Sequence, residues 1–212
     1  MARSLPDTIP LFPLPNVVHF PRVLLPLHIF EARYRAMVRD ALQGASLIGM
    51  VLLRGDWQAD YLGTPPIFQY GTAGEIVRSE ELPDGRFNII LRGAREFRVR
   101  SELMRALYRE AMVEWRYEET GALVASQRER LAELVGEFVR RRHPEAAGHF
   151  EPPSDDELFV NAISQQLDLP VIERQALLEA NGLSQRAERL IEVLDFHVEA
   201  LRSGAIGTAR PQ

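Results

Sequence analysis

The apolar residues of this 212-residue chain repeat with two different periods, and the change between them falls near Gly121. Before this point, apolar residues alternate with polar ones or form short runs, as they do in strands. After it, they recur every three to four residues, as they do on one face of a helix. We therefore expect an α+β protein, with a β-rich lobe over residues 1–118 and a helical lobe over residues 119–212.

The front part of the chain contains strand-like segments separated by turn residues, which predicts a rolled, mostly antiparallel sheet. The segments are Ile9–Leu14, Val23–Phe30, Leu47–Leu53, Ile67–Val77, Phe87–Leu91, Phe97–Val99 and Ala111–Tyr117. A hairpin turn is expected at Pro83-Asp84-Gly85, because Pro presets a turn dihedral and Gly accepts a positive φ. Prolines are dense before residue 27. Since proline cannot donate to a ladder, the first segments are expected at sheet edges or bends and not in a central strand.

One helix is predicted within the β-rich lobe. Its apolar stripe runs from Phe30 through Tyr34 to Leu42, with arginines on the other side, and Gly44 ends it. Two interpretations of the stripe stay open. Phe30 and Tyr34 either present their rings to a partner or anchor the helix in the core.

Four helices are predicted in the rear lobe. Apolar stripes indicate two long ones, over Leu131–Val139 and Ala187–Leu201. Between them, one short helix is expected to open at Ser154-Asp155-Asp156-Glu157, which is a capping-box pattern. The other is expected to follow Pro170 and to close near Asn181-Gly182.

The residue types that the chain lacks exclude several classes of enzyme. All 25 basic residues are arginines, and there is no cysteine. A P-loop, a Ser-Lys protease and a pyridoxal enzyme each require a lysine. The five histidines show no metal-binding spacing. We therefore expect no catalytic activity, no cofactor and no metal. A hydrolase site built from distant Ser, His and Asp residues stays open, and it would require these groups to converge in a polar cleft.

The start of the chain does not resemble a secretory signal. Met1–Pro15 contains Asp7 and four prolines, which interrupt any apolar core of a signal peptide. No later run approaches the roughly 18 apolar residues of a membrane span. We therefore expect a cytoplasmic protein that does not interact with a membrane.

Charge is distributed unevenly along the chain, whose formal net charge is -5. Residues 1–117 hold 15 arginines against 13 acidic residues, and residues 118–212 hold 10 against 17. Six arginines run along two of the predicted strands, interleaved with glutamates: Arg92, Arg95, Arg98, Arg100, Arg105 and Arg109, with Glu96, Glu102 and Glu110. Cross-strand ion pairs and an RNA-binding stripe are both open interpretations of this pattern.

Several segments together resemble one known family. Ile9–Pro21 (IPLFPLPNVVHFP) and Leu24–Arg35 (LLPLHIFEARYR) closely resemble the opening of the Lon protease N-terminal domain family, especially its stand-alone bacterial members. Further matches follow in the family's order at Ile48–Leu53, Gly71–Ile76, Leu82–Gly93, Arg95–Val99, Asp156–Phe159 and Glu173–Glu179. The resemblance covers about residues 8–201. Arg22 replaces a glycine that is usual in the family, and Ala32 replaces a common proline.

This resemblance implies a PUA-like β-barrel with an inserted helix, followed by an α-helical bundle. In full-length Lon proteases this region helps to recognise protein substrates and contributes to assembly, while separate downstream domains hydrolyse ATP and cleave peptide bonds. We expect this chain, which ends at Gln212, to lack those domains. No oligomeric state is predicted.

Our leading hypothesis is a non-catalytic module that binds exposed or unfolded polypeptide, or a partner protein, through an apolar groove on the β-rich lobe. The residues expected to form part of this surface are Pro26, Leu27, Phe30, Arg33 and Tyr34. The alternative is an RNA-binding PUA-like module that uses the arginines of the front lobe. The acidic overall balance argues against a nucleic-acid partner.

Overall fold

The computed structural model describes residues 5–60, 63–103, 107–116, 121–142 and 151–203. The chain forms two compact units, Met1–Glu118 and Glu119–Gln212. In the described residues the first unit contains a six-stranded mixed sheet and one α-helix, and the second contains helices only. The predicted α+β class is therefore confirmed.

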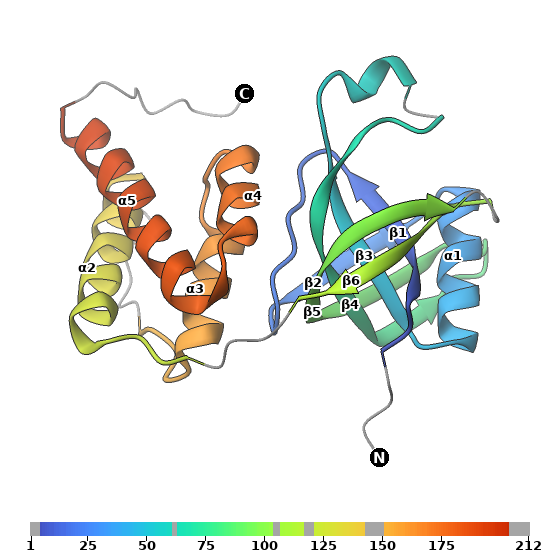
Figure 1. Cartoon of the computed structure of the whole chain (residues 1–212), viewed down its shortest axis with the longest axis horizontal. Coiled ribbons are helices and arrows are strands. Elements are labelled where there is room, and N and C mark those ends of the chain that lie inside the picture. Colours follow the sequence, from blue (N-terminus) through green and yellow to red (C-terminus); the bar gives the residue numbers. More distant parts are fainter. Residues whose placement is uncertain (1–4, 61–62, 104–106, 117–120, 143–150, 204–212) are drawn as a thin grey trace. The chain divides into compact units, whose positions relative to one another are not determined.

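The strands of the first unit curl into a barrel (Figure 1). They are β1 (Thr8–Leu14), β2 (Leu24–Ile29), β3 (Leu47–Leu53), β4 (Ile67–Glu81), β5 (Phe87–Leu103) and β6 (Arg109–Trp115). The sheet order is β2-β5-β4-β3-β1-β6, and an additional pairing between β5 and β6 closes five of the strands into a ring. β2 pairs only with β5 among the described strands, so it extends the sheet outside this ring. Of the pairings between the described strands, β1–β3 alone is parallel. A short 3-10 turn, η1 (Trp57–Asp60), lies between β3 and β4.

The segments predicted as separate strands at Phe87–Leu91 and Phe97–Val99 form the single strand β5, so their separation was wrong. The first part of β5 pairs with β2, and its second part pairs with β6. The register with β4 shifts between Ala73 and Gly74, opposite Gly93 and Arg95. This irregularity lets one strand bend from the outer sheet into the ring without a break in pairing.

The expectation that the proline-rich opening lies at an edge is wrong for β1, which lies between β3 and β6. β1 pairs with β6 over Thr8–Leu11 and with β3 over Leu11–Leu14. Pro10 is therefore in register with β6 alone, and Pro13 is in register with β3 alone. Each proline has a strand on one side only, which is the local situation of an edge, so its missing N–H is tolerated.

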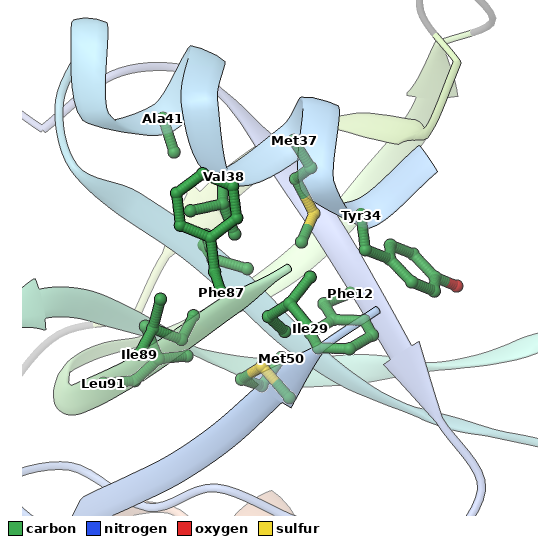
Figure 2. Packing of buried hydrophobic residues seen from close by; sticks show 11 residues of the cluster. Phe12, Ile29, Tyr34, Met37, Val38, Ala41, Met50, Phe87, Ile89 and Leu91 are labelled. Atoms are coloured by element: carbon green, nitrogen blue, oxygen red, sulfur yellow. The ribbon is translucent and has the colours of Figure 1, made fainter. Parts of the chain in front are cut away.

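The core between the sheet and α1 (Ala32–Gln43) is built from aliphatic and aromatic side chains. Figure 2 shows Met37, Val38 and Ala41 of the helix directed toward Ile89 and Phe87 of β5. The helix begins two residues later than its apolar stripe predicts, because Glu31 is the N-cap. Gly44 is its C-cap, as predicted.

The second unit contains α2 (Ala125–Arg142), α3 (Asp156–Gln166), α4 (Val171–Glu179) and α5 (Gly182–Arg202). The helices α2 and α5 lie side by side (Figure 1). Residues that come later in α2 contact residues that come later in α5. Gln127 bonds Glu188, Arg130 pairs with Asp195, and Glu137 pairs with Arg202. The two long helices therefore run in the same direction.

Two predicted helix ends are shifted in the second unit. The N-cap of α3 is Asp155 instead of Ser154, and its Oδ1 accepts a hydrogen bond of 2.8 Å from the N–H of Leu158. A carboxylate at this position also interacts favourably with the helix dipole, which a serine hydroxyl does not. Asn181 and Gly182 begin α5 instead of closing α4, whose C-cap is Ala180. Gly182 has a φ of 79°, which a helix end and an entry turn both favour, so sequence alone does not separate them.

The turn at Arg22 provides a stability test. Arg22 adopts a φ of 67° while its N–H donates a 2.7 Å hydrogen bond to the carbonyl oxygen of Gly93. A left-handed conformation costs a non-glycine residue about 1–2 kcal/mol, and the entropy of glycine offsets about 0.5–1 kcal/mol of that gain. We therefore expect Arg22→Gly to be more stable than Arg22→Ala by about 0.5–1 kcal/mol in urea unfolding. The alanine variant removes the same side chain but keeps the Cβ atom, and equal stability of the two variants would contradict the proposed strain.

Candidate functional site

Strand β2 directs alternate residues to opposite sides of the sheet. Leu25, Leu27 and Ile29 face the core that α1 covers, where Ile29 is fully buried. The residues between them, Leu24, Pro26 and His28, are exposed. The outward side of β2 therefore combines apolar side chains with a histidine at a sheet margin.

The outward side chains of β2, β5 and β4 form two rows across the sheet. In the first row, Pro26 is opposite Ile90, which is opposite Arg78. In the second, His28 is opposite Asn88, which is opposite Glu80. We call these the apolar row and the polar row. They lie two residues apart along every strand, a separation of about 7 Å.

A β-bulge at Val77 brings Arg78 and Glu80 to this face. Ile76 is in register with Leu91 and Arg78 with Ile90, so Val77 is the extra residue. Strict alternation from the inward Ile76 would direct Arg78 toward the core. The extra residue reverses the alternation, and β-bulges commonly redirect side chains in this way.

The two rows line a groove with a volume of about 430 Å³. Its lining residues are Pro26, Leu27, His28, Arg78, Glu80, Asn88, Ile89 and Ile90. This volume is in the range of known ligand sites, and the floor is apolar while one end is polar. The groove therefore suits a side chain or a short chain segment with both kinds of surface.

Hydrogen bonds orient His28 at the polar end of the groove. An arginine always donates, so Nε2 of His28 accepts a 3.2 Å hydrogen bond from Nη1 of Arg86. The ring proton is then on Nδ1, which donates to Oδ1 of Asn88 at 2.8 Å. Arg86 is itself held by Asp84, and hydrogen bonding from the main-chain N–H of Arg86 keeps the pKa of the Asp84 carboxyl below its ordinary value. The hairpin turn thus holds the histidine ring in a fixed orientation at the groove.

The structure separates the five residues predicted for the binding surface. Pro26 and Leu27 both line the groove, but only Pro26 belongs to the outward face, since the side chain of Leu27 packs against the core. Phe30 is 62% exposed, and its ring stacks on that of His28 at a centroid distance of 6.3 Å. Arg33 is outside the groove and pairs with Glu31 at 3.0 Å.

Tyr34 belongs to the core, so its ring does not form part of an accessible surface. It is 4% exposed and packs against Phe12 at a centroid distance of 4.3 Å (Figure 2). The start of α1 explains the difference from Phe30: Tyr34 lies on the first turn facing the sheet, whereas Phe30 precedes the helix. The core interpretation therefore holds for Tyr34, whereas the ring of Phe30 is exposed.

Sequence reasoning did not identify the residues that complete the groove, namely His28, Arg78, Glu80, Asn88, Ile89 and Ile90. The alternation in β2 and in the hairpin following Gly85 is visible in the sequence and places His28, Asn88 and Ile90 on one face. Arg78 and Glu80 had no comparable signal, because their placement depends on the bulge.

The arginines of the barrel are largely engaged with carboxylates. Arg92 pairs with Glu75 at 2.7 Å, and Arg109 pairs with Glu102. Arg100 pairs with Glu114, and Arg116 pairs with Glu96. Arg105 lies outside the described residues. These contacts favour the cross-strand ion pairs over a continuous cationic stripe.

Over the part of the chain that the structure describes, no group of His, Asp and Glu side chains has the arrangement of a metal site. In the same part, none of the helices is both long enough and apolar enough to cross a bilayer.

The barrel and the helical unit define an α+β protein of two units, and a groove with an apolar floor and one polar end lies on the barrel. The chain belongs to the family of the ATP-dependent protease La (LON) substrate-binding domain, whose model matches residues 8–195. This match confirms the family predicted from the opening segments.

Individual relatives agree with this assignment. The chain is 26% identical over 206 residues to the Lon protease of Flavobacterium johnsoniae, and 29% identical over 203 residues to Lon protease 2 of Syntrophobacter fumaroxidans. The alignments cover 94% of this chain in both cases, but only 25% and 26% of those proteases. The chain thus spans about a quarter of the length of these relatives.

Solved structures show the same fold. A crystal structure of a Lon N-terminal domain protein from Xanthomonas campestris superposes with a TM-score of 0.65 at 26% identity, covering 87% of this chain and 97% of that one. The N-terminal domain of a Mycobacterium avium complex Lon protease gives the same TM-score at 15% identity, covering 90% and 99%. The second likeness concerns the fold alone.

Proposed function

We propose that this protein binds exposed or unfolded segments of other polypeptides, or a partner protein, and does so without catalysing a reaction. The observation that carries the proposal is the groove over Pro26 and Ile90, which joins an apolar floor to a sheet margin. Membership of a substrate-binding domain family supports a role in recognition.

The surface around the groove supplies apolar area for such an interaction. Leu24 and Phe30 are among the exposed large hydrophobic residues, and they flank Pro26 along the same chain segment. Burial of one large apolar side chain contributes about 1.5–3 kcal/mol. Two or three such contacts contribute about 3–9 kcal/mol before the cost of ordering the bound chain is subtracted. A micromolar affinity needs about 8 kcal/mol net, so main-chain hydrogen bonds of the bound segment must contribute as well.

A binding measurement with one variant in the groove tests this function. A fluorescently labelled, permanently unfolded polypeptide is titrated with the protein, and anisotropy is recorded. Ile90 is half-buried on the groove floor, and Asp at this position places a charge against any apolar side chain that enters. We expect wild-type binding at micromolar concentration, and a loss of about tenfold or more in Ile90→Asp.

The matched control is Ile172→Asp, because Ile172 is a 57% exposed isoleucine on α4 in the other unit. It introduces the same side chain and the same charge away from the groove, so wild-type affinity is expected. Absence of wild-type binding, or equal affinity of both variants, would contradict the proposal. A single-stranded RNA oligonucleotide in the same assay tests the alternative partner, and the paired arginines lead us to expect no binding at physiological salt.

A further inference from the structure

Two charged side chains, Arg78 and Glu80, line the groove. Within the described residues, Arg78 and Glu80 make neither a hydrogen bond nor an ion pair, although both are exposed and line the groove. Nearby arginines are engaged: Arg92 pairs with Glu75, and Arg86 pairs with Asp84. Arg78 and Glu80 therefore remain available to a ligand.

The two charges lie in different rows, and this gives the groove a polarity. Arg78 ends the apolar row, and the aliphatic stem of an arginine can cover apolar surface while its guanidinium stays in water. Glu80 ends the polar row. There, both ring nitrogens of His28 are already used, by Asn88 and Arg86, so the carboxylate is the strongest acceptor that remains.

An extended polypeptide matches the distance between the rows. Side chains two positions apart in an extended chain face the same side, about 7 Å apart, which is also the separation of the rows along β5. A chain lying over Ile90 and Asn88 would direct one side chain into each row. The apolar row would reject a charge, and Glu80 would attract a cation.

We propose that the groove selects an extended polypeptide segment in which an apolar and a basic side chain are separated by one residue. The apolar side chain packs over Pro26 and Ile90 under the stem of Arg78. The basic side chain pairs with Glu80, while the guanidinium of Arg78 donates to main-chain carbonyls of the segment. This selectivity rests on the proposed function and specifies its ligand.

Three labelled peptides on one neutral, flexible host sequence provide the test. The first carries Leu and Arg separated by one residue, the second Leu and Asp at the same positions, and the third Leu and Arg as neighbours. We expect the wild-type protein to bind the first peptide about fivefold more tightly than either of the others in an anisotropy titration, because exposed ion pairs contribute modestly. In Glu80→Gln the preference over the second peptide is expected to disappear, and in Glu80→Arg it is expected to reverse.

The control is Glu133→Gln, which removes the same charge from a 70% exposed side chain on α2. It is expected to keep the wild-type preference, and the preference is expected to shrink at high salt. Equal binding of all three peptides by the wild type overturns the selectivity but leaves the proposed function standing. A loss of preference in Glu133→Gln as large as in Glu80→Gln also overturns it. If no peptide binds, the proposed function itself fails together with the selectivity.

Discussion

Replacing Gly93 with alanine is expected to destabilise the barrel by about 3 kcal/mol or more, through overlap with backbone atoms that cannot rotate away. A Cβ atom on Gly93 would lie 2.1 Å from the carbonyl oxygen of Phe20 and 2.8 Å from Cα of Pro21. The same segment is bonded to Gly93 on both sides, because Arg22 donates to its oxygen and its N–H donates to Val23. Relief of the overlap would therefore break the pairing that attaches β2 to β5.

Thermal unfolding followed by circular dichroism measures this effect. We expect Gly93→Ala to lower the Tm by about 10 °C or more. Gly121→Ala is the control, since a Cβ atom at Gly121 meets nothing within 4 Å. A wild-type Tm in Gly93→Ala would contradict this prediction, because it would mean that the segment before β2 is not closely packed against Gly93.

The second large effect concerns Arg186, which is expected to hold the helical unit together. This arginine is only 4% exposed, and its guanidinium donates to the carbonyl oxygen of Leu177 at 3.0 Å and to Oδ1 of Asn161 at 2.6 Å. Leu177 is in the last turn of α4, where its carbonyl oxygen also accepts the N–H of Ala180 at 3.2 Å and a cation is favoured by the helix dipole. One side chain of α5 thereby links α3 and α4.

Arg186→Met keeps much of the side-chain volume but removes every donor. Because hydrogen bonds to charged groups contribute about 1.5–3 kcal/mol each, we expect a loss of about 3 kcal/mol in urea unfolding. Arg189→Met is the control, since Arg189 makes one 3.1 Å hydrogen bond, to the carbonyl oxygen of Ala176. That variant is expected to stay within about 0.5 kcal/mol of the wild type. Equal losses in the two variants would show that α4 is not held through Arg186.

Local periodicity predicted the elements whose stability is decided locally. The stripe of α1 and the long stripes of α2 and α5 are visible because one helical face alone carries the apolar residues. The position of β1 was not predictable in the same way. Whether Pro10 lies at an edge depends on where two distant strands begin and end their pairing, and no local pattern records this.

The candidate groove was only partly predictable for a similar reason. Pro26 and Leu27 were identified because an apolar, proline-containing strand suits a sheet margin, and they line the groove. Glu80 was not identified, since the bulge at Val77 that redirects it is a property of the pairing between β4 and β5. Tyr34 was included in the predicted binding surface but is buried. The apolar stripe alone does not show which of its residues pack against the sheet.

The most direct test of the central claim is a titration of isotopically labelled protein with an unfolded peptide, followed by amide chemical shifts. If polypeptide binds on the outward face of β2, β5 and β4, the largest changes are expected at the amides of Leu27 and His28, which follow Pro26, and at the amides of Arg78–Glu80 and Asn88–Ile90. The amide shifts of α1, which packs on the core side of the sheet, should change little. Shift changes confined to the helical unit, or spread evenly over the barrel without a maximum at these strands, would contradict the account.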